Sequence, residues 1–206
     1  MDNKVVYSYD EAYKASLEYF ENNELAAKVF LDKYALRDNE NNILEKTPDM
    51  MHDRLAKEFY RIEKSKFKEP LTVDEIKAYI DHFHYIIPGG SPMSTIGNSY
   101  QIQSLGNCFV IANPYDSYSG ILYSDQQLVQ LMKRRGGVGL CLDNIRPKGL
   151  PTKNAAKTTD GIGVFMKRYS NSCKEVAQGG RRGAELLGLS IHHPEIETFI
   201  NTLFFL

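Results

Sequence analysis

The sequence predicts an α/β protein in two parts, a helical region over residues 1–87 and a region of alternating strands and helices over residues 88–206. In the first part, apolar side chains recur at the three- and four-residue spacing of amphipathic helices, and helix-capping residues precede several of these runs. The composition changes at Pro88, after which short apolar runs alternate with glycine-rich loops and helical patterns. We therefore expect two domains that meet at residue 88.

The overall composition excludes several functional classes. Of the 206 residues, 42% are hydrophobic and 25% are charged, as in ordinary globular proteins. The formal net charge of -1 leaves no basic excess to neutralise phosphates, so we expect no direct nucleic-acid binding. We find no apolar run that could span a bilayer, no leader sequence, and three widely spaced cysteines that do not resemble a disulfide framework. The sequence thus predicts a cytoplasmic protein that makes no membrane contact.

Two helices are expected near the N-terminus. Ser8 and Glu11 have the spacing of a capping box, in which two side chains three residues apart accept hydrogen bonds from each other's backbone N–H groups. Apolar positions at helical spacing follow them. A second apolar pattern covers residues 24–34 and ends at a polar turn over residues 37–42.

Two further helices complete the first region. Thr47 and Pro48 suit the N-cap and the first helical position. The apolar positions that follow at helical spacing are Met51, Leu55, Phe59 and Ile62. Thr72 and Glu75 form another capping box. Because all these helices alternate apolar and charged faces, the first region is expected to be a packing domain.

The second region begins with a loop and then alternates strands and helices. Residues 88–100, PGGSPMSTIGNSY, are rich in glycine, proline and hydroxyl groups, which is typical of a loop. The elements expected after it are, in order, a strand at 107–111, a helix at 124–132, a strand at 138–142, a helix at 161–177, a strand at 185–191 and a short helix from residue 193. This order is typical of an α/β protein.

Cys108 lies at the start of the first expected strand, after the small, turn-prone residues Gly106 and Asn107. A thiol at the edge of a buried strand, facing a polar loop, can take part in reactions that a core thiol cannot. The alternative interpretation is that Cys108 is simply buried, since free cysteine is among the most buried residue types. Cys141 and Cys173, on a strand and on an apolar helix face, are expected in the core.

Two basic loops with glycines flank the helix at 161–177, namely residues 146–157, RPKGLPTKNAAK, and residues 178–183, QGGRRG. Glycine lets the backbone approach a ligand, and Arg and Lys donate charge-assisted hydrogen bonds to phosphate oxygens. Neither loop has the Walker A or dinucleotide-binding spacing, and each alone is compatible with an exposed turn. Together they favour a site for an anionic ligand such as a nucleotide. Asp116 and Ser117, on the turn after the first strand, carry oxygens that can accept hydrogen bonds from a ribose hydroxyl.

No metal site is expected. His192 and His193 lie between a strand and a proline, without a Cys, Asp or Glu at ligand spacing. We therefore expect them to cap a helix or to pack. His82 and His84 lie on an expected helix and are assigned to packing or to the solvent-exposed surface.

Taken together, the segments resemble the large, catalytic (alpha) chain of ribonucleotide reductase. The motifs that carry the resemblance are, in order, GGSPMSTIGN, SLGNCFVI, LMKRRGGVGL, IRPKGLP, FMKRYSN and VAQGGRRGA. The resemblance covers residues 7–200. It implies a helical N-terminal domain followed by the first part of a ten-stranded α/β barrel, which is incomplete in this sequence. It also implies the reduction of ribonucleotides to deoxyribonucleotides for DNA synthesis by radical chemistry.

The resemblance also assigns roles to individual residues. Cys108 matches the first redox-active cysteine, which lies beneath the substrate ribose, delivers reducing equivalents at the 2′ carbon and ends in a disulfide with a later cysteine. Ser91, Asn107 and Arg182 match substrate-binding positions, the last in the second of two specificity loops. The positions that match the site for a deoxynucleoside triphosphate effector, which regulates the enzyme allosterically, are Asp116, with Ser117 beside it, Arg146 and Lys153.

The family's thiyl-radical cysteine and the disulfide partner of Cys108 have no counterpart in this sequence, and the final residues, NTLFFL, leave the family pattern. We therefore expect a truncated, frameshifted or split-gene fragment that has no reductase activity alone. Detectable turnover of a ribonucleotide by the purified chain would contradict this expectation. Complementation by a separately expressed C-terminal piece would identify a split enzyme.

The resemblance implies partners for the full enzyme. These are a ribonucleoside di- or triphosphate substrate, a deoxynucleoside triphosphate effector, a thioredoxin-like reductant, and a second copy of the chain that pairs through the helices at 125–132 and 161–177. The radical source is adenosylcobalamin or a metal-containing small subunit. The alternatives to an enzyme piece are a non-catalytic nucleotide-binding or assembly module and a gene remnant.

Overall fold

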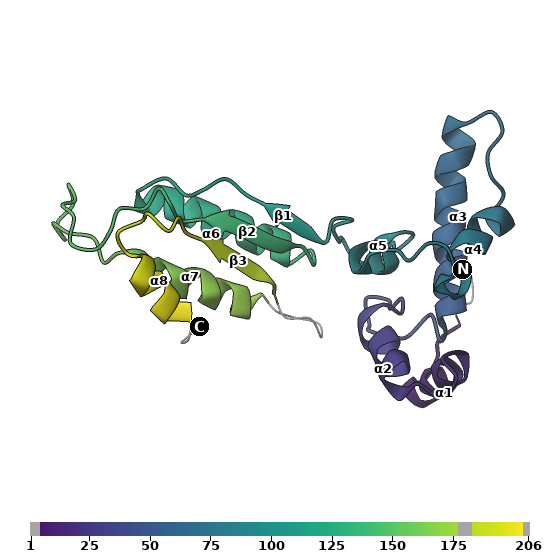
Figure 1. The fold of residues 1–206 in the computed structure, drawn as a ribbon. Coiled ribbons are helices and arrows are strands. Elements are labelled where there is room, and N and C mark those ends of the chain that lie inside the picture. The colour runs from purple at the N-terminus through teal and green to yellow at the C-terminus, as the bar shows by residue number, and fades with distance from the viewer. Residues whose placement is uncertain (1–4, 177–182, 204–206) are drawn as a thin grey trace. The chain divides into compact units, whose positions relative to one another are not determined.

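The computed structural model describes residues 5–176 and 183–203 and divides the chain into two compact units, which meet between Leu105 and Gly106 (Figure 1). We call them the helical unit and the α/β unit. This boundary lies later than residue 88, because the segment after Pro88 packs with the helices that precede it. Within the described residues, no helix is long and apolar enough to cross a membrane.

In its described residues, 5–105, the helical unit contains five α-helices and one short 3-10 helix. They are α1 (Tyr9–Tyr19), α2 (Glu24–Lys33), α3 (Pro48–Lys66), α4 (Val73–Ile80), η1 (Asp81–Phe83) and α5 (Gly90–Thr95). The four helices expected over residues 8–80 are confirmed. The Ser8 side chain accepts a hydrogen bond from the Glu11 backbone, and Thr72 with Glu75 forms the complete capping box. The loop expected at 88–100 is wrong in part, because α5 forms there with the Ser94 hydroxyl bound to the Gly90 carbonyl.

A buried ion pair holds the last part of the helical unit in place. Arg54 of α3 contacts Glu45 with 2.7 Å between Nε and Oε1, and both side chains are less than a tenth exposed. The same guanidinium donates to the backbone carbonyls of Met93 and Ile96. Gln101 further donates to the Arg37 carbonyl, at 3.1 Å. These contacts span some 40 to 60 residues of sequence, which is why local composition does not reveal the boundary.

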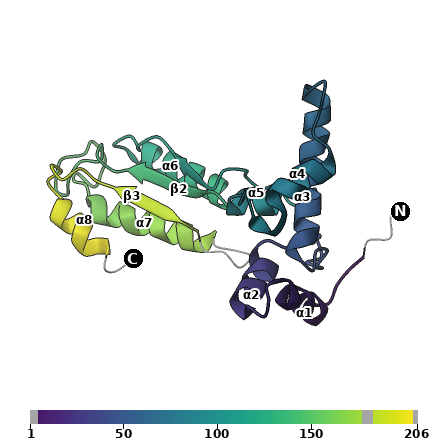
Figure 2. The same cartoon turned by 45° about the vertical axis from the view of Figure 1, so that its right-hand side comes forward.

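The α/β unit is a parallel sheet covered on one face by helices. Its strands are β1 (Cys108–Val110), β2 (Gly137–Cys141) and β3 (Glu185–Gly188), hydrogen-bonded in the order β1-β2-β3. The helices α6 (Tyr118–Met132) and α7 (Ile162–Glu175) connect them, and α8 (Ile196–Leu203) packs against α7 (Figures 1 and 2). The strand–helix alternation predicted from the sequence is confirmed.

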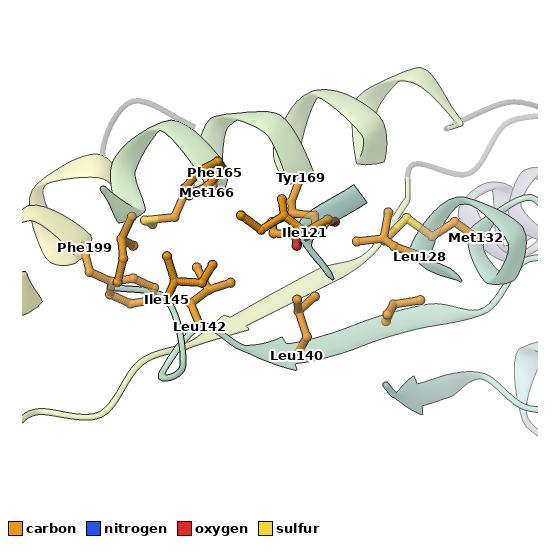
Figure 3. Close-up of a cluster of buried hydrophobic side chains, with 12 residues drawn as sticks. Ile121, Leu128, Met132, Leu140, Leu142, Ile145, Phe165, Met166, Tyr169 and Phe199 are labelled. Atoms are coloured by element: carbon orange, nitrogen blue, oxygen red, sulfur yellow. Dashed lines mark hydrogen bonds between the residues drawn. The ribbon is translucent and has the colours of Figure 1, made fainter. Parts of the chain in front are cut away.

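The core of this unit lies between the sheet and its two covering helices. Figure 3 shows Leu140 and Leu142 pointing from β2 and its end toward Met166 and Tyr169 of α7. Tyr169 is fully buried and donates its hydroxyl hydrogen to the Ile121 carbonyl of α6 at 3.1 Å, so it joins the two helices. The opposite face of the sheet carries exposed side chains in the described residues.

Glu185, at the start of β3, is a half-buried glutamate on the covered face, beside Val138 of β2. Its Oε1 atom is buried and lacks a hydrogen-bond partner among the described residues. Burial, together with the carboxylate of Asp125, raises the pKa of Glu185 to about 7. Asp125 itself is held by Arg168 of α7, with 2.9 Å between Oδ2 and Nη2. The carboxyl group of Glu185 therefore stays protonated to a higher pH than that of an exposed glutamate.

We expect Glu185→Gln to stabilise the protein in a pH-dependent way. Because the folded-state pKa lies above the ordinary value of 4.5, the contribution of the neutral carboxyl is present below that value and is lost as the pH rises through about 7. The amide stays neutral, so the free energy of unfolding should rise by about 1–3 kcal/mol near pH ~8 and change little near pH ~4. Urea unfolding of the variant, with exposed Glu197→Gln as control, checks this. Equal effects of the two variants, or at the two pH values, would contradict it.

Candidate functional site

A cavity of about 800 Å³ lies in the α/β unit where α6 and α7 begin. It is lined by the turn that precedes α6, by the loop between β2 and α7, and by the first turn of each helix. The residues that the family resemblance assigned to an effector site line it together, namely Asp116, Ser117, Arg146 and Lys153. The structure therefore brings into one cavity four residues that come from two separate loops.

Asp116 and Arg146 form an ion pair in the cavity wall. Asp116 Oδ2 accepts from Arg146 Nε at 2.5 Å, and Oδ1 accepts from the Arg146 backbone N–H at 3.3 Å. Arg146 Nη1 also donates to the carbonyl of Pro151, at 2.6 Å. Each side chain of the pair is about one third exposed. The guanidinium is thus held in one orientation while part of its surface remains accessible to an anion.

Ser117 is the N-cap of α6. Its hydroxyl oxygen accepts from the Gly120 backbone N–H at 3.1 Å. The hydroxyl hydrogen remains a donor, so Ser117 can still contact a ligand as it caps the helix. The N-termini of α6 and α7 both lie at the cavity, where partial positive charge favours an anion.

The basic loop between β2 and α7 folds back on itself as a short antiparallel ladder. Pro151 pairs with Thr158, Thr152 donates to the carbonyl of Lys157 at 2.7 Å, and Thr159 donates to that of Leu150 at 3.1 Å. Lys153 lies at the exposed turn of this ladder. These backbone hydrogen bonds help to set the conformation of the loop, and side-chain patterns in the sequence do not reveal them.

Cys108 is exposed and is the first residue of β1. This exposure is what an accessible, reactive thiol requires. The alternative interpretation, that Cys108 is simply buried, is wrong. Asn107, also exposed, accepts a hydrogen bond at its backbone carbonyl from Gly137 at 2.8 Å. Cys141 and Cys173 are half-buried. Burial and the nearby Glu185 raise the pKa of the Cys173 thiol, which makes it less reactive.

The structure describes one of the two remaining assigned residues. Ser91 is buried in the helical unit, in the first turn of α5. Arg182 lies outside the described residues, as does most of the loop 178–183. Within the described chain, His, Cys, Asp and Glu side chains do not gather into a group of three that could hold a metal. His193 is buried, lies with Nε2 2.9 Å from the Ile145 carbonyl and accepts the Glu195 N–H at Nδ1, which agrees with the expected capping role.

Glu195 was not predicted from the sequence, although it binds the backbone at both ends of the loop that lines the cavity. The only local signal is its place two residues after the buried His193. Its partners are main-chain N–H groups far away in sequence, and no side-chain pattern identifies them.

The fold and the cavity define an α/β protein with a site suited to an anionic ligand. Residues 106–203 match the family model described as ribonucleotide reductase, barrel domain. Similar proteins include the ribonucleoside-diphosphate reductase large chain 2 of Saccharomyces cerevisiae, 33% identical over 99 residues, which are 47% of this chain and 11% of the relative. The ribonucleoside-diphosphate reductase subunit alpha of Mycoplasma pneumoniae is 41% identical over 75 residues, which are 36% of this chain and 10% of the relative. The vitamin B12-dependent ribonucleoside-diphosphate reductase of Mycobacterium tuberculosis is 26% identical over 180 residues, which are 85% of this chain and 25% of the relative.

The chain is thus similar to ribonucleotide reductase large chains, and residues 106–203, just under half of it, match the family's barrel domain. It spans between about a tenth and a quarter of the length of the curated relatives it matches.

We expect Cys108 to be the most reactive thiol of the folded chain, because the other two are half-buried and only the thiolate form is nucleophilic. A short pulse of iodoacetamide followed by peptide mass mapping should modify Cys108 about tenfold or more faster than Cys141 or Cys173. Unfolding in urea should equalise the three rates. Similar rates in the folded chain, or faster modification of Cys173, would contradict the expected order.

Proposed function

We propose that the chain contributes the first part of the catalytic barrel of a ribonucleotide reductase, with its cavity as a binding site for a deoxynucleoside triphosphate effector. The observation that carries the proposal is the cavity itself. It joins a carboxylate, Asp116, with the cations Arg146 and Lys153 at the N-termini of two helices, within the region that matches the barrel domain.

The chemistry of the cavity supports a nucleoside triphosphate. Its volume lies within the range usual for small-molecule sites. Arg146 and Lys153 offer charge-assisted hydrogen bonds to phosphate oxygens, and the carboxylate of Asp116 can accept one from a sugar hydroxyl. Tyr118 and Phe165, whose rings meet edge to face with 5.9 Å between centroids, supply an aromatic wall for a base.

For the catalytic step we propose that Cys108 is a reductant. Two thiols give up two electrons and two hydrogens, the 2′ C–O bond of the substrate becomes a C–H bond, water leaves, and the two sulfurs form a disulfide. A thioredoxin-like dithiol then reduces that disulfide by thiol exchange. An exposed thiol suits both reactions. The second cysteine of the pair is the later one that the family resemblance implies.

The relatives are named ribonucleoside-diphosphate reductases, so we propose a ribonucleoside diphosphate as substrate. Asn107, Ser91 and Arg182 are assigned to it by resemblance. One relative is named vitamin B12-dependent, which favours adenosylcobalamin over a metal-containing small subunit as radical source. The steps assigned to this chain are nucleotide binding and thiol oxidation, and none requires a metal held by its described residues.

A homodimer is the proposed assembly. The outer faces of the two covering helices carry the exposed apolar residues Leu122, Tyr123 and Val164. These are the helices that the resemblance assigns to the dimer interface, beside the effector cavity.

A non-catalytic nucleotide-binding module is the second candidate, because Cys108 is not among the residues that line the cavity and nucleotide binding there needs no thiol. The two functions differ in what Cys108→Ser would do. The substitution would leave nucleotide binding unchanged under either, and it would abolish reduction in a complemented enzyme only under the first. An unfolded purified chain would indicate a gene remnant.

We expect the purified chain to bind dTTP, and Arg146→Ala and Lys153→Ala each to weaken binding by about 10-fold or more, as the loss of a charge-assisted hydrogen bond predicts. Isothermal titration calorimetry measures both. The matched control is Lys167→Ala, an exposed lysine of α7 outside the cavity. Absence of dTTP binding by the unmodified chain, or an equal loss in the control, would refute the effector site.

A further inference from the structure

Glu195 connects the two ends of the loop that lines the cavity. Its Oε2 atom accepts from the backbone N–H of Lys148 at 3.0 Å and from that of Ile162, also at 3.0 Å. Lys148 lies near the beginning of the loop, and Ile162 is the first residue of α7. A single carboxylate oxygen therefore holds together two points of the backbone that are separated by the whole ladder carrying Lys153.

The start of α7 is shaped to admit this carboxylate. The N-cap of α7 is Gly161, which has φ 81° and no side-chain cap of its own. A Cβ atom there would lie 2.5 Å from Glu195 Oε1 and 2.7 Å from Oε2, closer than any real contact. Only glycine leaves room for the carboxylate, and Glu195 then satisfies the first unpaired N–H of the helix. Its negative charge is favourable at that end of the helix.

His193 links the segment that carries Glu195 to the chain just before the loop. Its Nε2 lies 2.9 Å from the Ile145 carbonyl, one residue before Arg146, and its Nδ1 accepts the Glu195 backbone N–H at 3.1 Å. With Nε2 as donor and Nδ1 as acceptor, the ring is neutral. His193 thus binds the chain just before Arg146. Glu195 binds it near the beginning of the loop, at Lys148, and at the end of the loop, at Ile162.

The position of Glu195 distinguishes it from a ligand contact. It does not line the cavity, and both of its acceptor contacts are to backbone N–H groups. A carboxylate near a site for a triphosphate is unfavourable by charge alone. Glu195 can therefore contribute to binding only through the shape of the loop, because its carboxylate holds the backbone at Lys148 and at Ile162.

We propose that Glu195 is a positioning residue for the nucleotide cavity, which it keeps formed by holding both ends of the loop 148–162. The inference rests on the proposed effector site. Without the carboxylate, the loop samples open arrangements in which Arg146 and Lys153 no longer face the ligand together. Apparent affinity then falls in proportion to the fraction of molecules with the loop closed.

Three variants and two readouts test the inference. Glu195→Ala removes the acceptor, Glu195→Asp keeps the charge but shortens the reach, and Glu195→Gln keeps an acceptor oxygen at full length. Glu197→Ala, an exposed glutamate two residues further on, is the control. The readouts are dTTP affinity by calorimetry and amide hydrogen exchange, followed at Lys148 and Ile162 and at the core amides of β2.

We expect Glu195→Ala and Glu195→Asp to weaken dTTP binding by about 10-fold and to speed exchange at Lys148 and Ile162, with β2 amides still protected. Glu195→Gln should recover most of the affinity, and the control should match the unmodified chain. The inference is overturned if Glu195→Ala binds dTTP normally. It is also overturned if the loss of affinity comes only with loss of protection throughout β2, or if Glu195→Gln is no better than Glu195→Ala. If the unmodified chain fails to bind dTTP, the effector site itself is refuted and the positioning role falls with it.

Discussion

The parallel direction of the three strands is the constraint on which the rest of the α/β unit depends. In a parallel sheet with helical crossovers, every strand ends at the same edge, so the loops that follow the strands lie together. The turn with Asp116 follows β1, the loop with Arg146 and Lys153 follows β2, and the segment with Glu195 follows β3. Residues far apart in sequence therefore share one cavity or its immediate support.

The same constraint separates the cavity from Cys108, the cysteine proposed as a reductant. Cys108 is at the amino end of β1, opposite the edge where the cavity lies. Its neighbour in register is Gly137 of β2, and the N–H of Val138 donates to the carbonyl of Ala184, the residue just before β3. A nucleotide in the cavity and a substrate at Cys108 would thus lie at opposite ends of the same three strands.

Sequence patterns predicted the features that depend on residues close together in the chain. They did not predict the features that depend on contacts between residues far apart in the chain. The capping residues Ser8 and Thr72 act within three residues, so their helices were predictable, and the strand–helix order followed from short apolar runs. The cavity residues were grouped by family resemblance, since nothing local relates Asp116 to Arg146. The unit boundary was missed because it depends on Arg54 binding carbonyls of Met93 and Ile96, and α5 was missed because its composition is that of a loop.

The bare face of the sheet bears on the choice between the catalytic and the binding-only function. Cys108 shares that face with Val110, which is 90% exposed, and with Leu186, which is 66% exposed. Gly139 lies between these two in register, and a Cβ there would meet only ordinary contacts, at 3.8 Å or more. The glycine therefore leaves open space above the sheet and does not relieve a clash. Under the proposed catalytic function, the exposed apolar face beside Cys108 leaves room for the sugar of a substrate. Under the proposed binding-only function, the ligand lies at the opposite edge of the sheet and the exposed thiol has no role.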